Sequence, residues 1–233
     1  MKEDEDIAAV CATLCETSTG VEHPIEALGK VVSKTDALLI VDGISGAGAC
    51  ELRLDTWNVD VLAVGSQKAL MLPPGLAAIV VSKKARALLE QKEKRPAYYF
   101  DLRAALDKAG DADTPYTPAL TLIYALEGAL KMIEDEGIEN VFERHRRLAA
   151  ACRAGVKALG MTIFPERSSA ALTCVLMPEG VNAEAVRKTM QKDFGVMVAG
   201  GQADLKGRVI RIAHMGTSAR PTCSWVSSHS RCR

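Results

Sequence analysis

Four unbroken apolar segments of strand length alternate with helical or turn-rich stretches in the first half of the chain. They are Val10–Leu14, Ala37–Val41, Val59–Val64 and Leu76–Val81. Runs of this kind are typical of parallel strands that helices bury on both faces. Between the first two, Pro24–Ser33 carries apolar residues at helical spacing, which predicts a strand–helix–strand unit. The pattern therefore predicts a parallel α/β sheet covered by helices.

The second half begins with two long amphipathic patterns. Apolar residues recur at steps of three and four over Thr121–Glu136 and Asn140–Leu159, and a glycine follows each stretch, so two helices are predicted. After them we expect the strands Met161–Phe164, Ala171–Met177 and Val209–Ala213, with a helix over Ala183–Phe194. This order favours a smaller α+β domain after the sheet domain.

We place the joint between these two domains near Pro115–Pro118. The expected domains are residues 1–115 and residues 116–216. Residues 217–233 differ in composition, with five Ser, three Arg and two Cys but no Leu, Ile or Phe. A segment with so little apolar surface to bury is predicted to be disordered.

Charge and composition narrow the function classes. Lys plus Arg equal Asp plus Glu at 29 each, so no basic surplus favours nucleic acid or an anionic membrane surface as a partner. No apolar run approaches the roughly 20 residues that a membrane helix needs, and Met1–Asp6 is acidic where a signal peptide would be basic. We expect a cytoplasmic protein that acts on small molecules.

The seven cysteines do not indicate a metal site. They are odd in number and scattered, without a C-x-x-C pair, whereas zinc and iron–sulfur sites normally show closely spaced ligands. Reduced thiols and no metal are expected.

Two charged residues follow predicted strands. Asp42 comes directly after Ala37–Val41, and Lys68 follows Val59–Val64 within Gly65–Lys68. Ligands bind at the carboxyl ends of strands in open α/β sheets. An Asp there is also a common turn or helix cap, and a loop Lys is usually a solvated charge. A partly desolvated Lys, however, is a usable nucleophile for Schiff-base chemistry.

Five motifs in sequence order resemble those of class V aminotransferases, which depend on pyridoxal 5'-phosphate. They are Glu16–Val21, Val41–Ser45, Gly65–Leu70, Pro73–Gly75 and Arg211–Gly216. The resemblance runs from about Ile7 to Gly216 and is closest to the alanine–glyoxylate and serine–glyoxylate branch. It implies a fold-type I transferase, with part of the large sheet domain and most of the small C-terminal domain.

The resemblance also implies three chemical roles. Lys68 would hold the cofactor as an aldimine and then, as a freed amine, move the substrate proton. Asp42 would keep the pyridine nitrogen protonated, which deepens the electron sink. Arg211 would grip the substrate carboxylate, although a strand-end surface arginine is the alternative.

Four further residues would surround the cofactor in the same resemblance. Ser66 and Gln67 would lie near its phosphate, Thr17 near the 3-oxygen of the ring, and Ile44 against one ring face. His214, next to the arginine strand, is more simply explained as a packed core residue and is left out of the catalytic set.

The family shares its active site between two subunits, so a homodimer is expected. A Tyr or Thr of one subunit reaches the phosphate of the other, and Thr114, Tyr116 and Thr117 are the candidates here. The family's large domain also normally starts upstream of Met1. The chain is therefore expected to be a fragment that lacks the phosphate-binding turn and the ring-stacking aromatic, with a weakened affinity for the cofactor.

The expected reaction transfers an amino group from alanine or serine to glyoxylate. Another class V reaction, that of a cysteine desulfurase-like lyase, is the first alternative. Those relatives usually place His before the cofactor lysine, whereas Gln67 precedes Lys68 here. The second alternative is a truncated protein that keeps Lys68 and Asp42 but binds no cofactor.

Overall fold

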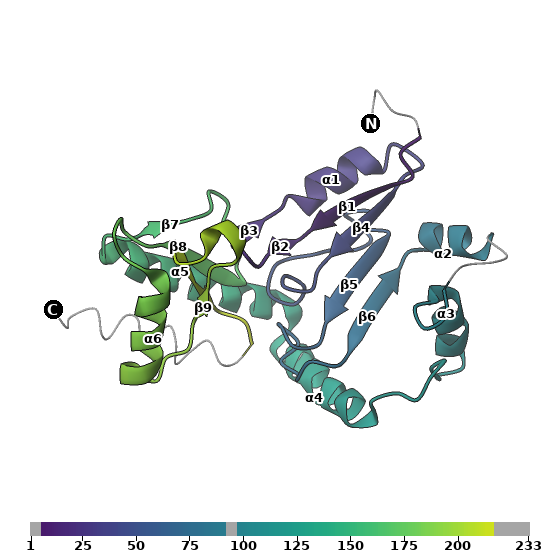
Figure 1. The fold of residues 1–233 in the computed structure, drawn as a ribbon. Coiled ribbons are helices and arrows are strands. Elements are labelled where there is room, and N and C mark those ends of the chain that lie inside the picture. The colour runs from purple at the N-terminus through teal and green to yellow at the C-terminus, as the bar shows by residue number, and fades with distance from the viewer. Residues whose placement is uncertain (1–5, 92–96, 217–233) are drawn as a thin grey trace.

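A computed structural model of the chain describes residues 6–91 and 97–216 (Figure 1). Its first sheet has the order β1-β4-β5-β6. Strands β1 (Ala9–Thr13), β4 (Leu38–Asp42) and β5 (Val61–Gly65) run parallel, as the sequence predicts. Because their carboxyl ends meet at one edge, the residues that follow β4 and β5 are brought together there.

The fourth strand corrects the expectation of an all-parallel sheet. Strand β6 (Ala77–Val81) pairs antiparallel with β5. Residues 66–76, which connect the two strands, form turns and contain no helix, whereas a parallel return needs a crossover connection of about a dozen or more residues. Strand β6 is also mostly exposed, with Ile79 and Val80 each 41% accessible.

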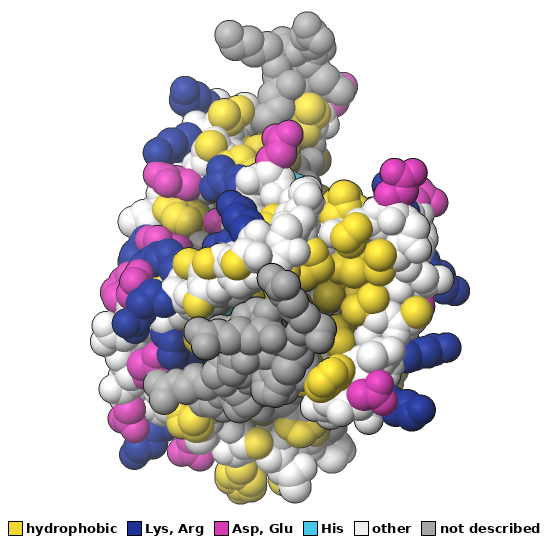
Figure 2. Space-filling model, turned by 90° about the vertical axis from the view of Figure 1, so that its left-hand side faces the viewer, with side chains coloured by type: hydrophobic (Ala, Val, Ile, Leu, Met, Phe, Trp, Pro, Cys, Tyr) yellow, Lys and Arg dark blue, Asp and Glu magenta, His cyan; other side chains and the backbone are white. Residues whose placement is uncertain are grey.

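Burial on both faces, the second expectation for these strands, is also wrong for the part of the chain that the structure describes. In β4, Leu39 and Val41 are fully buried, whereas the alternate residues Leu38 and Ile40 are only half-buried and Asp42 is exposed. The buried side chains pack with helix α1, and the other face remains more open. Many large hydrophobic side chains are accordingly exposed on the molecule (Figure 2).

Helix α1 (Ile25–Val32) confirms the predicted strand–helix–strand unit. Ile25, Gly29 and Val32 are its buried residues, and the helix contacts β4. Gly29 lets the helix approach the chain at Trp57, because a Cβ at this position would overlap the Trp57 carbonyl oxygen.

A short hairpin joins the two halves of the molecule. It consists of β2 (Cys15–Glu16) and β3 (Val21–Glu22), which the apolar pattern did not reveal because each strand has only two residues. Val21 also forms a β-bridge with Ser168, and Ser169 N–H donates to the Gly20 carbonyl.

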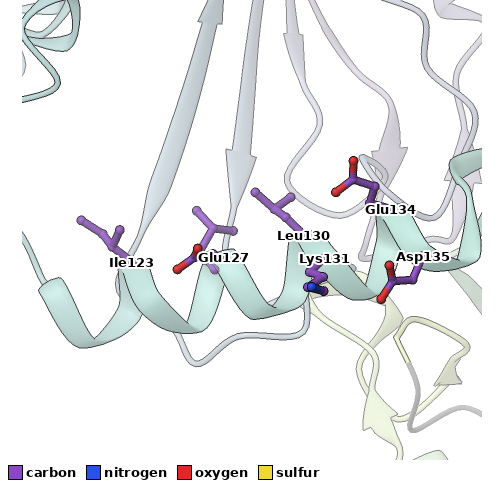
Figure 3. Close-up of a pocket in the computed structure, with 7 residues that line it drawn as sticks. Ile123, Glu127, Leu130, Lys131, Glu134 and Asp135 are labelled. Atoms are coloured by element: carbon purple, nitrogen blue, oxygen red, sulfur yellow. The ribbon is translucent and has the colours of Figure 1, made fainter.

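Four helices follow the first sheet. Helices α2 (Lys83–Glu90) and α3 (Leu102–Gly110) were not predicted, whereas α4 (Leu120–Glu136) and α5 (Ile138–Ala158) confirm the two amphipathic patterns. Helix α4 passes below β5 and β6 (Figures 1 and 3). Only one of its residues, Ala129, is buried, so its apolar stripe is largely uncovered by the residues described.

The second sheet is antiparallel and has the order β7-β8-β10-β9. Its elements are β7 (Thr162–Ile163), β8 (Leu172–Leu176), α6 (Ala183–Phe194), β9 (Ala199–Gly200), the 3-10 turn η1 (Ala203–Leu205) and β10 (Val209–Ala213). Helices α5 and α6 both contact this sheet. The three predicted strands and the helix Ala183–Phe194 are confirmed.

One hydrophobic core runs through both sheets. Leu39, Val41 and Leu62 of the first sheet belong to the same buried cluster as Leu172 and Val209 of the second. The expected domain division at Pro115–Pro118 remains a prediction. The tail, residues 217–233, lies outside the described residues, and no helix within residues 6–91 and 97–216 has the length and hydropathy to cross a bilayer.

The α1 contact gives a stability prediction. Gly29→Ala should lower the free energy of unfolding by about 1–3 kcal/mol, the usual cost of overpacking, although alanine favours a helix. Gly128→Ala in α4 is the matched control, because no atom lies within 4 Å of its added Cβ, and it should stabilise by up to about 1 kcal/mol. Urea denaturation of both variants measures the difference, and equal effects would contradict the close α1 packing.

Candidate active site

Asp42 is the last residue of β4 and is exposed at the carboxyl edge of the sheet. Its Oδ1 accepts a hydrogen bond of 2.8 Å from the Ile44 N–H, which fixes the orientation of the carboxylate. Its Oδ2 makes no hydrogen bond within the described ranges. The second oxygen is therefore available to a protonated ring nitrogen.

A short turn places Lys68 just beyond the neighbouring strand. Gly65 ends β5, and the Lys68 carbonyl accepts a 3.0 Å hydrogen bond from the Met71 N–H. Met71 has φ +64°, a conformation that costs a non-glycine residue about 1 kcal/mol or more. The Lys68 side chain is half-buried.

Ser66 holds this turn together from inside. It is 2% exposed, and its hydroxyl donates to the Pro73 carbonyl at 2.8 Å and accepts from the Leu76 N–H at 3.2 Å. A hydroxyl has a single proton to donate, so this one cannot also donate to a phosphate while it bonds Pro73. The geometry favours a structural role for Ser66 rather than the phosphate contact that the resemblance implies.

Ile44 and Gln67 converge above Gly65. A Cβ built on Gly65 would lie 3.1 Å from Ile44 Cγ2 and 3.0 Å from Gln67 Oε1, so a side chain there would crowd both. The structure thus places the expected ring-packing residue and the expected phosphate residue next to each other. Both are exposed and accessible to a ligand.

Lys68 lines a hollow of about 350 Å³ between two distant parts of the chain. One wall comes from its own turn and includes Met71 and Leu72, and the other comes from Ala213, Met215 and Gly216 after β10. The motifs included Lys68 and the segment Arg211–Gly216 but did not reveal that the two face each other, because only the folded chain brings the segment after β10 against the turn.

Arg211 connects the second sheet to the hairpin beside the first. Its Nε donates to the Gly200 carbonyl and its Nη1 to the Thr17 carbonyl, both at 2.8 Å. One Nη1 proton and both Nη2 protons remain, so the end of the guanidinium can still grip a carboxylate with two parallel hydrogen bonds. The hydroxyl of Thr17 is hydrogen-bonded to Ser45, in the loop that follows Asp42.

The hairpin turn also carries a stabilised carboxylate. Hydrogen bonds from the Ser18 hydroxyl and N–H lower the pKa of Glu16, and the nearby Arg211 adds to this effect. Glu16 is therefore charged at neutral pH, and its charge fixes the turn that presents the Thr17 carbonyl to Arg211.

His214 is a packed core residue, as expected. It is fully buried, its Nε2 lies 3.0 Å from Thr173 Oγ1, and its Nδ1 lies 3.2 Å from the Ala170 carbonyl oxygen. Burial lowers the pKa of His214 to about 4. The imidazole is neutral at pH 7 and holds β10 against β8 rather than titrating with a substrate.

The candidates for a subunit-crossing contact do not line the Lys68 hollow. Thr114 Oγ1 donates to the Tyr116 carbonyl at 2.6 Å, and the Tyr116 hydroxyl donates to the Tyr98 carbonyl at 3.1 Å. Tyr116 also stacks on Tyr99 with ring centroids 4.9 Å apart. Thr114, Tyr116 and Thr117 lie in the segment that joins α3 to α4 (Figure 1).

Two other hollows differ in chemistry. One, of about 540 Å³, is lined by Thr13 and Ala63, which flank Asp42 in register, and also by His23 and by Leu28 of α1. The other, of about 530 Å³, follows the exposed side of α4 between Ile123 and Asp135 (Figure 3) and contains none of the expected site residues. Sequence reasoning missed Thr13, because its register with Asp42 is seen only in the folded sheet.

The five cysteines within residues 6–91 and 97–216 are free thiols. Four of them, Cys15, Cys50, Cys152 and Cys174, are buried, and Cys11 is exposed. The redox state of the cysteines stays a prediction, and Cys223 and Cys232 lie outside the described residues.

Comparison with known proteins identifies the family of this chain. The family model of aminotransferase class-V matches residues 2–222. The chain belongs to the class V aminotransferases. This confirms the family inferred from the five motifs and its fold-type I architecture, and the family implies pyridoxal phosphate as the cofactor.

Similar proteins include several aminotransferases. An uncharacterized aminotransferase of Methanocaldococcus jannaschii is 43% identical over 215 residues, which cover 91% of this chain and 56% of that protein. The serine–glyoxylate aminotransferase of Methylorubrum extorquens is 37% identical, with 92% and 56% covered. The crystal structure of the ureidoglycine–glyoxylate aminotransferase of Bacillus subtilis superposes with a TM-score of 0.85 at 33% identity, covering 94% and 58%. The chain thus spans somewhat more than half the length of these relatives.

The buried imidazole gives a pH prediction. Because the pKa of His214 is about 4 in the folded chain and about 6.5 when unfolded, the unfolded state binds more protons between these values. Stability should therefore fall as pH is lowered, by about 2 kcal/mol between pH 7 and pH 5 from this residue. His214→Gln, which cannot titrate, should lose that part of the pH dependence.

Urea denaturation of both proteins at pH 7 and pH 5 measures this difference. Burial also lowers the pKa of His145, but that contribution is common to both proteins and cancels in the comparison. An identical pH dependence in wild type and His214→Gln would show that His214 titrates normally in the folded chain.

Proposed function

We propose that the chain carries the cofactor-lysine and substrate-arginine parts of a pyridoxal-phosphate-dependent transaminase that moves an amino group from alanine or serine to glyoxylate. The observation that carries the proposal is the shared edge of the sheet. Asp42 ends β4 and Lys68 follows the adjacent parallel strand β5, and the Thr17 carbonyl ties Arg211 to the hairpin beside that edge. The serine–glyoxylate activity named for the Methylorubrum relative supports the substrate class.

The donor set fits pyridoxal phosphate in three respects. Asp42 has a carboxylate oxygen available for a ring N–H, Lys68 offers a half-buried primary amine, and Ile44 presents an exposed apolar side chain between them in sequence. When bound, the cofactor supplies an electron sink for the substrate's Cα electrons. Gln67 can donate to the phosphate through its amide, whereas Ser66 supports the turn from behind.

Three residues of the chain would have separate roles in the reaction. Lys68 Nζ would hold the cofactor and, once released, would move the proton between the substrate Cα and C4′ of the cofactor. Asp42 keeps a proton on the ring nitrogen by presenting a negative charge. Arg211 orients the substrate through its carboxylate, and its bonds to Gly200 and Thr17 preorganise the guanidinium.

The domain and partner assignments belong to the same proposal. Residues 1–115 would contribute the cofactor side of the site and residues 116–216 the substrate arginine. Two such chains would form a homodimer, with the segment containing Thr114, Tyr116 and Thr117 directed toward the other subunit. The exposed aromatic rings of Tyr98, Tyr99 and Phe100 support an interface near this segment.

Cofactor attachment is the direct test. The purified chain is incubated with pyridoxal phosphate, reduced with borohydride and mapped by peptide mass spectrometry. A phosphopyridoxyl group on Lys68 is expected, and Lys68→Ala should abolish it. Lys84→Ala is the matched control, because the Lys84 amine is held by the Ala37 carbonyl on the other end of the sheet and should not affect trapping at Lys68.

Trapping spread over many lysines, or unchanged by Lys68→Ala, would overturn the assigned role of Lys68. Trapping at Lys68 without transamination of alanine or serine would limit the chain to cofactor binding. A complete lack of trapping would favour the non-catalytic alternative.

Arg211 gives a second prediction. Arg211→Lys keeps the positive charge but cannot make two parallel hydrogen bonds to the substrate carboxylate. The kcat/KM for the amino acid should therefore fall by about 10-fold to 100-fold, the range for one lost charged hydrogen bond. Arg86→Lys is the matched control, because Arg86 forms an exposed ion pair with Glu90 in α2. An unchanged kcat/KM in Arg211→Lys would mean that another group binds the carboxylate.

A further inference from the structure

Arg144 links the Lys68 hollow to the junction of α4 and α5. From α5, its Nε and Nη2 donate to the two carboxylate oxygens of Glu136, at 2.6 and 2.9 Å. Its Nη1 donates to the Gly216 carbonyl at 3.0 Å. The guanidinium therefore forms a two-pronged ion pair on one side and holds a backbone carbonyl on the other.

Gly216 lies directly against the turn that carries Lys68. It is buried, has φ +68°, and lines the hollow together with Lys68 and Met71. A Cβ on Gly216 would lie only 2.9 Å from Met71 Cγ, and the Met71 N–H is bonded to the Lys68 carbonyl. A displacement of Gly216 would consequently change the wall next to the lysine.

The environment distinguishes this pair from the surface ion pairs. The Arg144 side chain is 16% exposed, less than any other ion-pair partner in the described part of the chain, and that of Glu136 is 34% exposed. Arg86 and Glu90, by contrast, are 55% and 59% exposed. Exposed ion pairs contribute little to stability. In the less exposed pair, the two hydrogen bonds to Glu136 fix the Arg144 guanidinium, and with it the third hydrogen bond to the Gly216 carbonyl.

We propose that Arg144, held in place by Glu136, is a positioning residue that fixes the Met215–Gly216 wall of the Lys68 hollow. It acts through the Gly216 carbonyl and touches neither cofactor nor substrate. The importance of this wall to catalysis rests on the proposed role of Lys68. The contact between Arg144 and the wall does not depend on the reaction.

The test compares Arg144→Gln and Glu136→Gln with wild type in two measurements on the chain without cofactor. Hydrogen exchange of the amides of residues 213–216 should become about ten-fold faster in each variant, the factor that corresponds to one lost charge-assisted hydrogen bond. Trace acetylation with acetic anhydride, read by mass spectrometry, should label Lys68 faster relative to the exposed Lys30. Arg187→Gln, which removes the Arg187–Glu184 pair of α6, should change neither measurement.

Arg144→Lys separates positioning from mere charge. An ammonium group can hold the Gly216 carbonyl or Glu136 but cannot reproduce the three-bond geometry, so partial recovery of slow exchange at residues 213–216 is expected. Circular dichroism of each variant verifies that it folds. If Arg144→Gln did not fold, the milder Glu136→Gln and Arg144→Lys would provide the same comparison.

Unchanged exchange at residues 213–216 and unchanged Lys68 labelling in folded variants would overturn the proposal. The outcome is separate from the test of Lys68 itself. Failure to trap pyridoxal phosphate on wild-type Lys68 would reject the cofactor role while leaving both measurements valid, and Lys68→Ala should not alter exchange at residues 213–216.

Discussion

The candidate site depends on one continuous hydrophobic core that joins a parallel sheet to an antiparallel one. Leu39 and Val41 pack in the same cluster as Leu172 and Val209, so the edge of the first sheet and β10 of the second have a fixed relation. The hydrogen bond from Arg211 to the Thr17 carbonyl spans 194 positions of sequence and depends on that relation. Without the shared core, the lysine and the arginine would lie on surfaces that move independently.

The sequence predicted those elements whose local signals and tertiary environment agree. Helix Ala183–Phe194 has an Asn182 side chain that caps its first turn and Gly195 in the left-handed conformation at its end, and both signals are local. Strand Val209–Ala213 lies within a sheet that α5 and α6 both contact. Helix α2, in contrast, begins Lys-Lys-Ala-Arg and buries only Ala85, so its apolar pattern is weak. The direction of β6 also could not be read from its composition, because an apolar run looks the same in either orientation.

Local sequence signals are limited in the same way for the candidate site. Motifs located Asp42, Lys68 and Arg211, because each stands beside small or strand-forming residues in a recognisable order. They did not reveal that the Ser66 hydroxyl is used to close the turn, since this depends on the 2.8 Å bond to Pro73. Nor did they reveal Arg144, which is 72 positions from Gly216 and lies in a helix, α5, that carries four other Lys and Arg residues. Contacts between distant segments carry this information, and a single sequence shows no trace of them.

The exposure of Asp42 bears on how such a site could work. A carboxylate in water stabilises a ring N–H only weakly, because the solvent screens its charge and competes for its oxygens. The Ile44 N–H already orients one oxygen, and an aromatic ring packed against Ile44 would shield the carboxylate from water. Binding of the cofactor and strengthening of the Asp42 interaction would therefore be coupled, and a rigid wall on the Lys68 side would favour both by limiting the positions that the ring can adopt.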